Sequence, residues 1–146
     1  MRLVLNGEPR ELDARTDEML VDLLRRNGLL SVRETCGIGV CGACTVLVDG
    51  DAISGCLFLA RAAENRDVTT VEGLGRDDPV QRAFSAAHAF QCGYCTPGMV
   101  LTAKRLLEES SRPTEAEVRE AMSGNLCRCG SYVKIVEAVL RAAAAG

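Results

Sequence analysis

Eight cysteines constrain this 146-residue chain more than any other feature, because they divide into two sets of four. The first set has the spacing C-x4-C-x2-C and is followed by a fourth cysteine. The second set is a C-x2-C pair followed by a C-x-C pair. Soft thiolates bind metals in a reducing compartment and form disulfides in an oxidising one, so the compartment decides how they are interpreted. The two sets are Cys36, Cys41, Cys44 and Cys56, and Cys92, Cys95, Cys127 and Cys129.

The sequence indicates a cytoplasmic chain, unless it is exported with a partner. The apolar stretch at residues 3–5 is too short for the core of a signal peptide, and no apolar run approaches the roughly 18 residues of a membrane span. Thiols stay reduced in the cytoplasm, which favours metal ligation over disulfides. The net charge of −3 and an aromatic content of 3% also exclude the basic, aromatic-rich pattern of a nucleic-acid binder.

The first half of the chain has the pattern of strands and turns around one helix. Asn-Gly and Asp-Gly pairs predict two hairpins, and a β-branched run predicts a last strand. Thr16 is expected to cap a helix whose apolar stripe runs from Met19 to Leu24 and which Asn27-Gly28 closes. These elements together predict a small mixed sheet packed on one helix. The expected strands are 3–5 with a return reaching Leu12, 45–48 with a return at 52–53, and 68–71.

The second half predicts four helices with short connections. Asp78 and Thr96, each followed by proline, are expected to cap the first two, over 79–90 and from Pro97 onward. A Thr114–Glu117 capping box begins the third, which Gly124 ends, and Ser131 begins the fourth. Glycines and charges near 73–78 place the boundary, so the expected fold is α+β with domains 1–75 and 76–146. Each half has about 70 residues, a size at which a hydrophobic core alone gives marginal stability. Each half is therefore expected to be stabilised by its own metal site.

The first cysteine set has the spacing of a plant-type [2Fe–2S] ferredoxin. Cys56 completes four thiolate ligands. Glycines at 37, 39 and 42 suit a loop that wraps closely around a cluster, because glycine accepts positive φ. A structural zinc ion is the alternative, although C-x4-C-x2-C is an unusual spacing for zinc.

The second cysteine set is less specific, because C-x2-C with C-x-C suits zinc and iron–sulfur equally well. Both pairs immediately precede predicted helix starts, at Thr96-Pro97 and at Ser131. The positive ends of those helices would stabilise an anionic thiolate site. Spacing alone leaves the metal open.

Three segments together resemble one family: CGIGVCGACTVLVDG at 36–50, QCGYCTPGM at 91–99 and GNLCRC at 124–129. They are similar to the iron–sulfur subunit of the molybdenum hydroxylases, the family of xanthine dehydrogenase, aldehyde oxidoreductase and aerobic carbon monoxide dehydrogenase. The resemblance implies an N-terminal β-grasp ferredoxin-like domain and a C-terminal four-helix domain. It also implies that each domain holds one [2Fe–2S] cluster, which selects iron–sulfur for the second set.

The resemblance further implies partners and a direction of electron flow. A large subunit would bind the molybdopterin (Mo) cofactor and oxidise the substrate, and a medium subunit would bind FAD. The second cysteine set would lie near the pterin and the first near the flavin. Gln91 and Cys129 would contact the pterin, and residues around Gly93, Pro97, Gly98 and Gly130 would face the large subunit. The chain would be the electron-transfer subunit between these cofactors.

Two other functions are compatible with parts of the sequence. A free-standing two-cluster ferredoxin needs the cysteines but not the QCGYCTPGM segment, and a zinc-stabilised interaction module needs neither iron nor sulfide. The only histidine, His88, is expected on the 79–90 helix and is not expected to be a ligand. No catalytic group of the chain's own is evident, so its chemistry would be that of bound cofactors.

Overall fold

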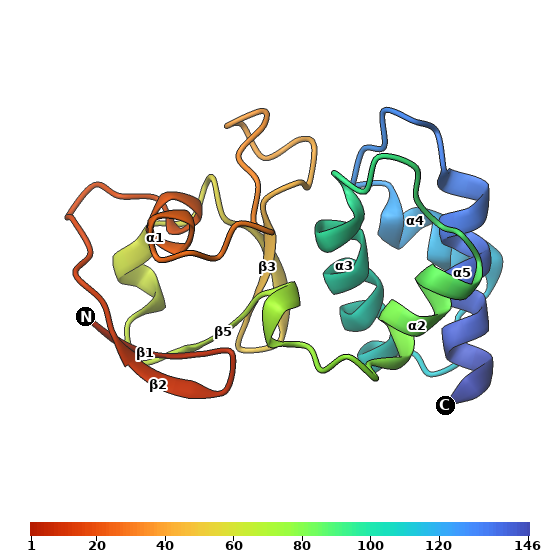
Figure 1. Cartoon of the computed structure of the whole chain (residues 1–146), viewed down its shortest axis with the longest axis horizontal. Coiled ribbons are helices and arrows are strands. Elements are labelled where there is room, and N and C mark those ends of the chain that lie inside the picture. The colour runs from red at the N-terminus through yellow and green to blue at the C-terminus, as the bar shows by residue number, and fades with distance from the viewer.

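The computed structural model describes all 146 residues, which form a sheet region from β1 to η2 and a helical region from α2 to α5 (Figure 1). The two chain ends lie at opposite ends of the long axis. The predicted α+β class is confirmed. The elements are β1 Arg2–Leu5, β2 Glu8–Glu11, α1 Leu20–Arg26, β3 Thr45–Val48, β4 Asp51–Ser54, η1 Ala60–Ala63, β5 Asp67–Thr69, η2 Val71–Gly73, α2 Pro79–Ala86, α3 Thr96–Glu109, α4 Glu115–Met122 and α5 Tyr132–Ala145.

Two hairpins and one inserted strand make a five-stranded mixed sheet in the order β2-β1-β5-β3-β4. Asn6 and Asp49 have φ values of 53° and 51°, and the glycine after each also has positive φ. Positive φ at both central residues is the geometry of a type I′ hairpin, so both predicted turns are confirmed. Strand β5 runs parallel to β1 and antiparallel to β3, which joins the two hairpins into one sheet.

Helix α1 begins later than expected. Thr16 does not cap it, because Met19 is the N-cap residue and no side chain supplies a capping bond. Met19 is held extended by an isolated bridge to Leu59, so the helix starts only at Leu20. The predicted core stripe is otherwise correct, since Leu20, Leu23 and Leu24 are fully buried.

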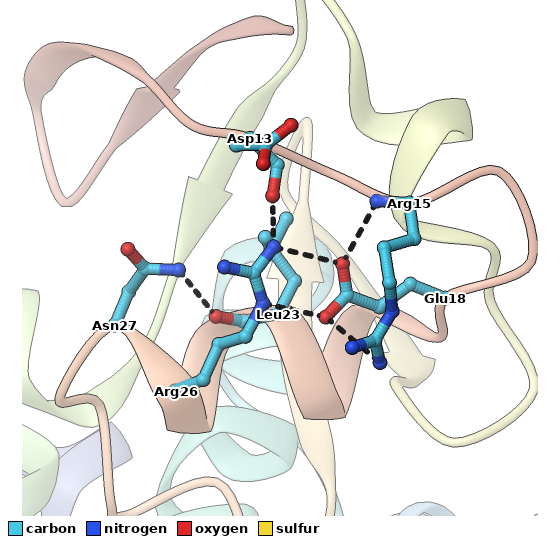
Figure 2. A network of polar contacts seen from close by, with 6 residues as sticks. All are labelled: Asp13, Arg15, Glu18, Leu23, Arg26 and Asn27. Atoms are coloured by element: carbon cyan, nitrogen blue, oxygen red, sulfur yellow. Dashed lines mark hydrogen bonds and ion pairs between the residues drawn. The ribbon is translucent and has the colours of Figure 1, made fainter.

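The segment before α1 is anchored by the buried carboxylate of Glu18 (Figure 2). Arg26 donates to both carboxylate oxygens, from Nε to Oε1 at 2.6 Å and from Nη2 to Oε2 at 3.0 Å. The Arg15 N–H donates to Oε2 at 3.1 Å, and Arg26 also donates to the Asp13 carbonyl. The hydrogen bond from Arg26 outweighs burial and lowers the pKa of Glu18. A charged residue is therefore buried here only because it is fully paired.

Helix α2 begins as predicted but ends early. The Asp78 carboxylate accepts the N–H groups of Val80 and Gln81, as an N-cap does. The helix stops at Ala86 rather than at residue 90, because His88 has φ of 50° and Ala89 N–H donates to the Phe84 carbonyl at 2.9 Å. These are the features of a Schellman motif. The sequence did not predict it, because histidine occupies the position where glycine is usual.

The remaining helix starts agree with the predictions to within a residue. Thr114 and Glu117 form the full capping box of α4, which ends at Met122 just before Gly124. Ser131 is the N-cap residue of α5, although its side chain makes no capping bond. Thr96 is wrong as the α3 cap, because Cys95 occupies that position and Thr96 is already helical. A cysteine of the second set thus lies at a helix N-terminus.

Each region has its own hydrophobic core, and α3 joins them. The sheet region packs α1 against β1, β3 and β5, and the helical region packs α2, α3 and α5 around Phe84 and Ile135. Figure 1 shows α3 between β3 and the other helices, and α3 contacts both β3 and β4. Arg105 of α3 also pairs with Asp51 of β4 at 3.0 Å. The helical region therefore packs directly against the β3–β4 end of the sheet.

Candidate metal centres

The first three cysteines lie on one irregular loop, residues 36–44, which leads into β3. Gly37, Gly39 and Gly42 have φ values of 66°, 74° and 68°, which turn the chain repeatedly in the left-handed region that glycine tolerates. Backbone N–H groups of Ile38 and Cys41, together with the Cys41 side chain, lower the pKa of the Cys36 thiol to about 6. The N–H groups of this loop therefore stabilise a negative charge on the Cys36 sulfur.

Cys44 and Cys56 form the buried side of this first set. They are 2% and 7% exposed, and the two side chains are neighbours. The Gly55 N–H donates to the Cys44 carbonyl at 3.1 Å, which holds the segment carrying Cys56 against the loop. Burial raises the pKa of the Cys44 thiol to about 11. The Cys44 thiol therefore needs a nearby cation, such as a bound metal ion, in order to lose its proton.

The C-x2-C loop, residues 92–95, runs into the start of α3. The Tyr94 N–H donates to Cys92 Sγ at 3.5 Å, and this bond together with the Cys129 side chain lowers the pKa of Cys92. Burial raises the pKa of Cys95 to about 12, with further contributions from the neighbouring Cys127. As in the first set, one thiol has a lowered pKa and a second has a raised pKa.

The C-x-C loop, residues 127–129, runs into the start of α5. The Ser131 N–H donates to Cys127 Sγ at 3.4 Å, and the Cys127 N–H donates to the Tyr132 hydroxyl at 2.8 Å. Burial alone would raise the pKa of Cys127, but the hydrogen bonds from Ser131 and Cys95 together lower it. Both predicted helix N-termini therefore lie at cysteines of the second set.

The structure brings the four cysteines of each set together. In the first set Cys36 lies near Cys41, and Cys44 lies near Cys56 and Cys41. In the second set Cys92 lies near Cys129 and Cys127, and Cys95 lies near Cys127 and Cys92.

The four thiols of each set suit a [2Fe–2S] cluster. A [2Fe–2S] cluster takes two thiolates on each of two irons, and backbone N–H groups aimed at the sulfurs stabilise its negative charge. All eight thiols are free, and both sets have such N–H groups. The donor set and its surroundings therefore match the cluster.

A buried polar joint ties the two cysteine sets to each other. Asn125 is 4% exposed, and its Nδ2 donates to the Gly42 carbonyl at 3.0 Å, while Thr102 of α3 donates to its Oδ1 at 2.9 Å. The Leu126 N–H donates to the Cys41 carbonyl at 2.9 Å. A side chain at Gly98 of α3 would place Cβ 2.3 Å from the Gly42 oxygen, so only glycine permits this approach.

A cavity of about 400 Å³ lies at this joint, and cysteines of both sets line it. Cys41 comes from the first set, and Cys92, Cys95 and Cys127 come from the second. Figure 1 shows the loop before β3 and the loops before α3 and α5 along the same edge of the molecule. The two candidate centres are therefore near neighbours.

Gln91 and Cys129, the two predicted pterin contacts, are adjacent in the structure. Gln91 is exposed, and its Nε2 donates to the Cys129 carbonyl at 3.3 Å. Gly98 itself is buried against Gly42, and the contact of the residues around it with the large subunit stays a prediction. The sequence did not single out Asn125 or Arg33, which link the loops. Both are polar residues close to a cysteine motif, and nothing else in the sequence marks them.

Comparisons with known proteins agree with this geometry. The family model described as "2Fe-2S iron-sulfur cluster binding domain" matches residues 3–73, and that described as "[2Fe-2S] binding domain" matches residues 70–140. The chain is 49% identical to the nicotinate dehydrogenase small FeS subunit of Eubacterium barkeri, covering 95% of this chain and 91% of that protein. It is 47% identical to the xanthine dehydrogenase iron-sulfur-binding subunit of Escherichia coli O157:H7, covering 93% and 89%.

A solved structure extends the match to the fold. The aldehyde oxidoreductase of Desulfovibrio desulfuricans superposes with a TM-score of 0.93 at 44% identity, covering 99% of this chain and 17% of that one. The chain belongs to the iron–sulfur subunit family of the molybdenum hydroxylases. As a member of that family it has two [2Fe–2S] cluster-binding domains, a ferredoxin-like domain followed by a helical one. None of its helices combines the length and apolar character needed to cross a bilayer.

Proposed function

We propose that this chain conducts electrons between a molybdenum-containing large subunit and a flavin-containing subunit. The observation that carries the proposal is the joint at Asn125, whose hydrogen bonds connect the loops that carry the two four-cysteine sites. Electron transfer between two centres requires that they be close and held at a fixed spacing. Substrate oxidation would belong to the large subunit.

The eight cysteines are the proposed cluster ligands. Cys36 and Cys41 would bind one iron of the first cluster, and Cys44 and Cys56 the other. Cys92 with Cys129, and Cys95 with Cys127, would do the same for the second cluster. This division joins each thiol to the cysteine whose side chain interacts with it most strongly. When bound, such clusters accept and release single electrons.

Exposed apolar side chains beside the cysteines support docking to larger partners. Large exposed hydrophobic residues occur mostly within a few positions of a cysteine, and contiguous patches of this kind mark interfaces. In the aldehyde oxidoreductase of D. desulfuricans, the matching region is one part of a much longer chain. The residues are Ile38, Val40, Leu57 and Leu59 near the first set, and Phe90, Tyr94, Leu126, Tyr132 and Val133 near the second.

We assign the pterin contact to Gln91 and Cys129, which lie together at the surface of the second site. We expect Gln91→Ala to keep both clusters but to weaken pterin retention or to slow reduction of the clusters by substrate, because the amide supplies both a donor and an acceptor. Gln81→Ala is the matched control, since the Gln81 amide also donates to a backbone carbonyl at 3.3 Å. Full cofactor content and full internal electron-transfer rate in Gln91→Ala would contradict the assignment.

A free-standing two-cluster ferredoxin in the cytoplasm is the second candidate, favoured only by the completeness of the two cysteine sets. Purification of the tagged full chain from its own host separates the two functions. The proposed function predicts stoichiometric co-purification of a large subunit that contains molybdenum and pterin. A chain that carries both clusters and remains alone, at every salt concentration tested, would instead be a diffusing carrier.

A further inference from the structure

Arg33 connects the loop of the first cysteine set to the loop of the second. It lies three positions before Cys36, and its backbone N–H donates to the Ala43 carbonyl at 3.1 Å, inside the first loop. Its guanidinium reaches the C-x2-C loop instead. Nη1 donates to the Gly93 carbonyl at 3.0 Å and to the Tyr94 carbonyl, and the group lies over the Tyr94 ring, 4.7 Å from the centroid.

The peptide that Arg33 holds is the one that contacts a cysteine sulfur. The Gly93 carbonyl and the Tyr94 N–H belong to the same planar peptide unit. On one side of this unit the carbonyl accepts from Arg33, and on the other side the N–H donates to Cys92 Sγ at 3.5 Å. A cation at the oxygen polarises the peptide and strengthens its N–H as a donor, as in any chain of hydrogen bonds.

The arginine has no competing partner. No carboxylate lies within ion-pair distance of Arg33, whereas most other arginines of the sheet region have one. The Tyr94 side chain is held in place by its hydroxyl, which lies 3.1 Å from the Thr35 hydroxyl. The positive charge is therefore directed at the C-x2-C loop alone.

We propose that Arg33 is a positioning residue of the sheet region that sets the reduction potential of the second cluster through the Gly93–Tyr94 peptide. This inference rests on the proposed function. Reduction adds negative charge to a cluster, and both a nearby cation and stronger N–H···S bonds stabilise that charge. Arg33 therefore raises the potential of the second cluster, and it makes that potential depend on correct docking of the two regions.

The test is a redox titration of the full chain with both clusters reconstituted from ferrous iron and sulfide, followed by electron paramagnetic resonance. Arg33→Met removes the charge and the donors but keeps a similar length. We expect a more negative midpoint potential and an altered line shape for the second cluster, and a smaller change for the first. Arg33→Lys keeps the charge and the ability to donate to the carbonyls, but it lacks the planar guanidinium that lies over the Tyr94 ring, so we expect a partial shift.

Arg66→Met is the matched control, because Arg66 also lies over an aromatic ring, that of Phe58 at 5.8 Å, but contacts neither cysteine loop. It should leave both potentials unchanged. The inference is overturned if Arg33→Met holds both clusters and titrates like Arg66→Met. If Arg33→Met loses the second cluster, Arg33→Gln takes its place as the neutral variant, and a wild-type potential of the second cluster in Arg33→Gln overturns the inference. Failure of the wild-type chain to take up iron and sulfide would reject the proposed function itself, before any variant is compared.

Discussion

The two cysteine sets reach the same arrangement by different routes. The first set is mostly local, with three cysteines on one loop that glycines bend and that backbone N–H groups line. The second set is assembled by tertiary structure, from two loops that precede α3 and α5. The local site depends on its own backbone, whereas the assembled site depends on helix packing and on contacts from the sheet region.

The most drastic way to separate the two sites is to remove a ligand from each. Cys41→Ser should lose the first cluster and Cys95→Ser the second, because each removes one of four proposed ligands. Half of the iron and sulfide should remain in each variant, with the resonance signal of the untouched cluster intact. If either variant lost both signals while staying in solution, the two sites would not be independent.

Thiol reactivity in the cluster-free chain should differ within the first site by orders of magnitude. Cys36 has a pKa of about 6 and is mostly thiolate at pH 7, whereas Cys44 has a pKa of about 11 and stays protonated. Alkylation of Cys36, followed by mass spectrometry, should therefore be half-maximal near pH 6, while Cys44 stays slow across the neutral range. Equal rates that both rise toward pH 9 would show that the loop is not preformed.

Core substitutions should release the two clusters in different orders. Phe84 of α2 is 2% exposed, and Phe84→Ala should cost about 3–5 kcal/mol of helical packing. We expect the second cluster to be lost at a lower temperature than the first, which keeps its signal. Leu23→Ala in α1 is the counterpart, at about 2–5 kcal/mol, and should weaken the first site. Release of the first cluster before the second in Phe84→Ala would contradict the dependence on helix packing.

The smallest expected effect concerns the joint between the regions. Asn125→Ala leaves Thr102 without its partner and should cost about 1–3 kcal/mol. We expect denaturant unfolding to split into two transitions, because the regions lose their main buried polar connection. Asn27→Ala is the control, since the Asn27 amide donates to the Leu23 carbonyl within the sheet region, at 2.7 Å. A single transition with an unchanged midpoint in Asn125→Ala would show that apolar contacts of α3 suffice.

The fold was predictable wherever a local signal acts alone. Asn-Gly and Asp-Gly turns, the Asp78 cap and the Thr114–Glu117 capping box all appear where the sequence predicts them. The errors have two causes. Thr16 does not start a helix because Met19 is bridged to the distant Leu59, and α2 ends early because His88 takes a local conformation that glycine usually adopts.

The candidate site was likewise predictable where a local motif defines it, and not where tertiary contacts do. Cysteine spacing and family motifs nominate all eight cysteines and Gln91. They do not disclose which cysteine of the C-x2-C loop neighbours which of the C-x-C loop, because that depends on how α3 and α5 start relative to each other. Nor do they single out Arg33 or Asn125, whose partners are 60 and 83 positions away in the chain.

Metal analysis of the purified full chain tests the central claim most directly. Two [2Fe–2S] clusters predict four iron and four acid-labile sulfide per chain, because eight cysteines supply eight terminal ligands. The reduced chain should show two distinguishable paramagnetic centres, since a glycine-rich loop and a pair of helix starts surround the clusters differently. Stoichiometric zinc without sulfide, in a colourless chain, would contradict the account.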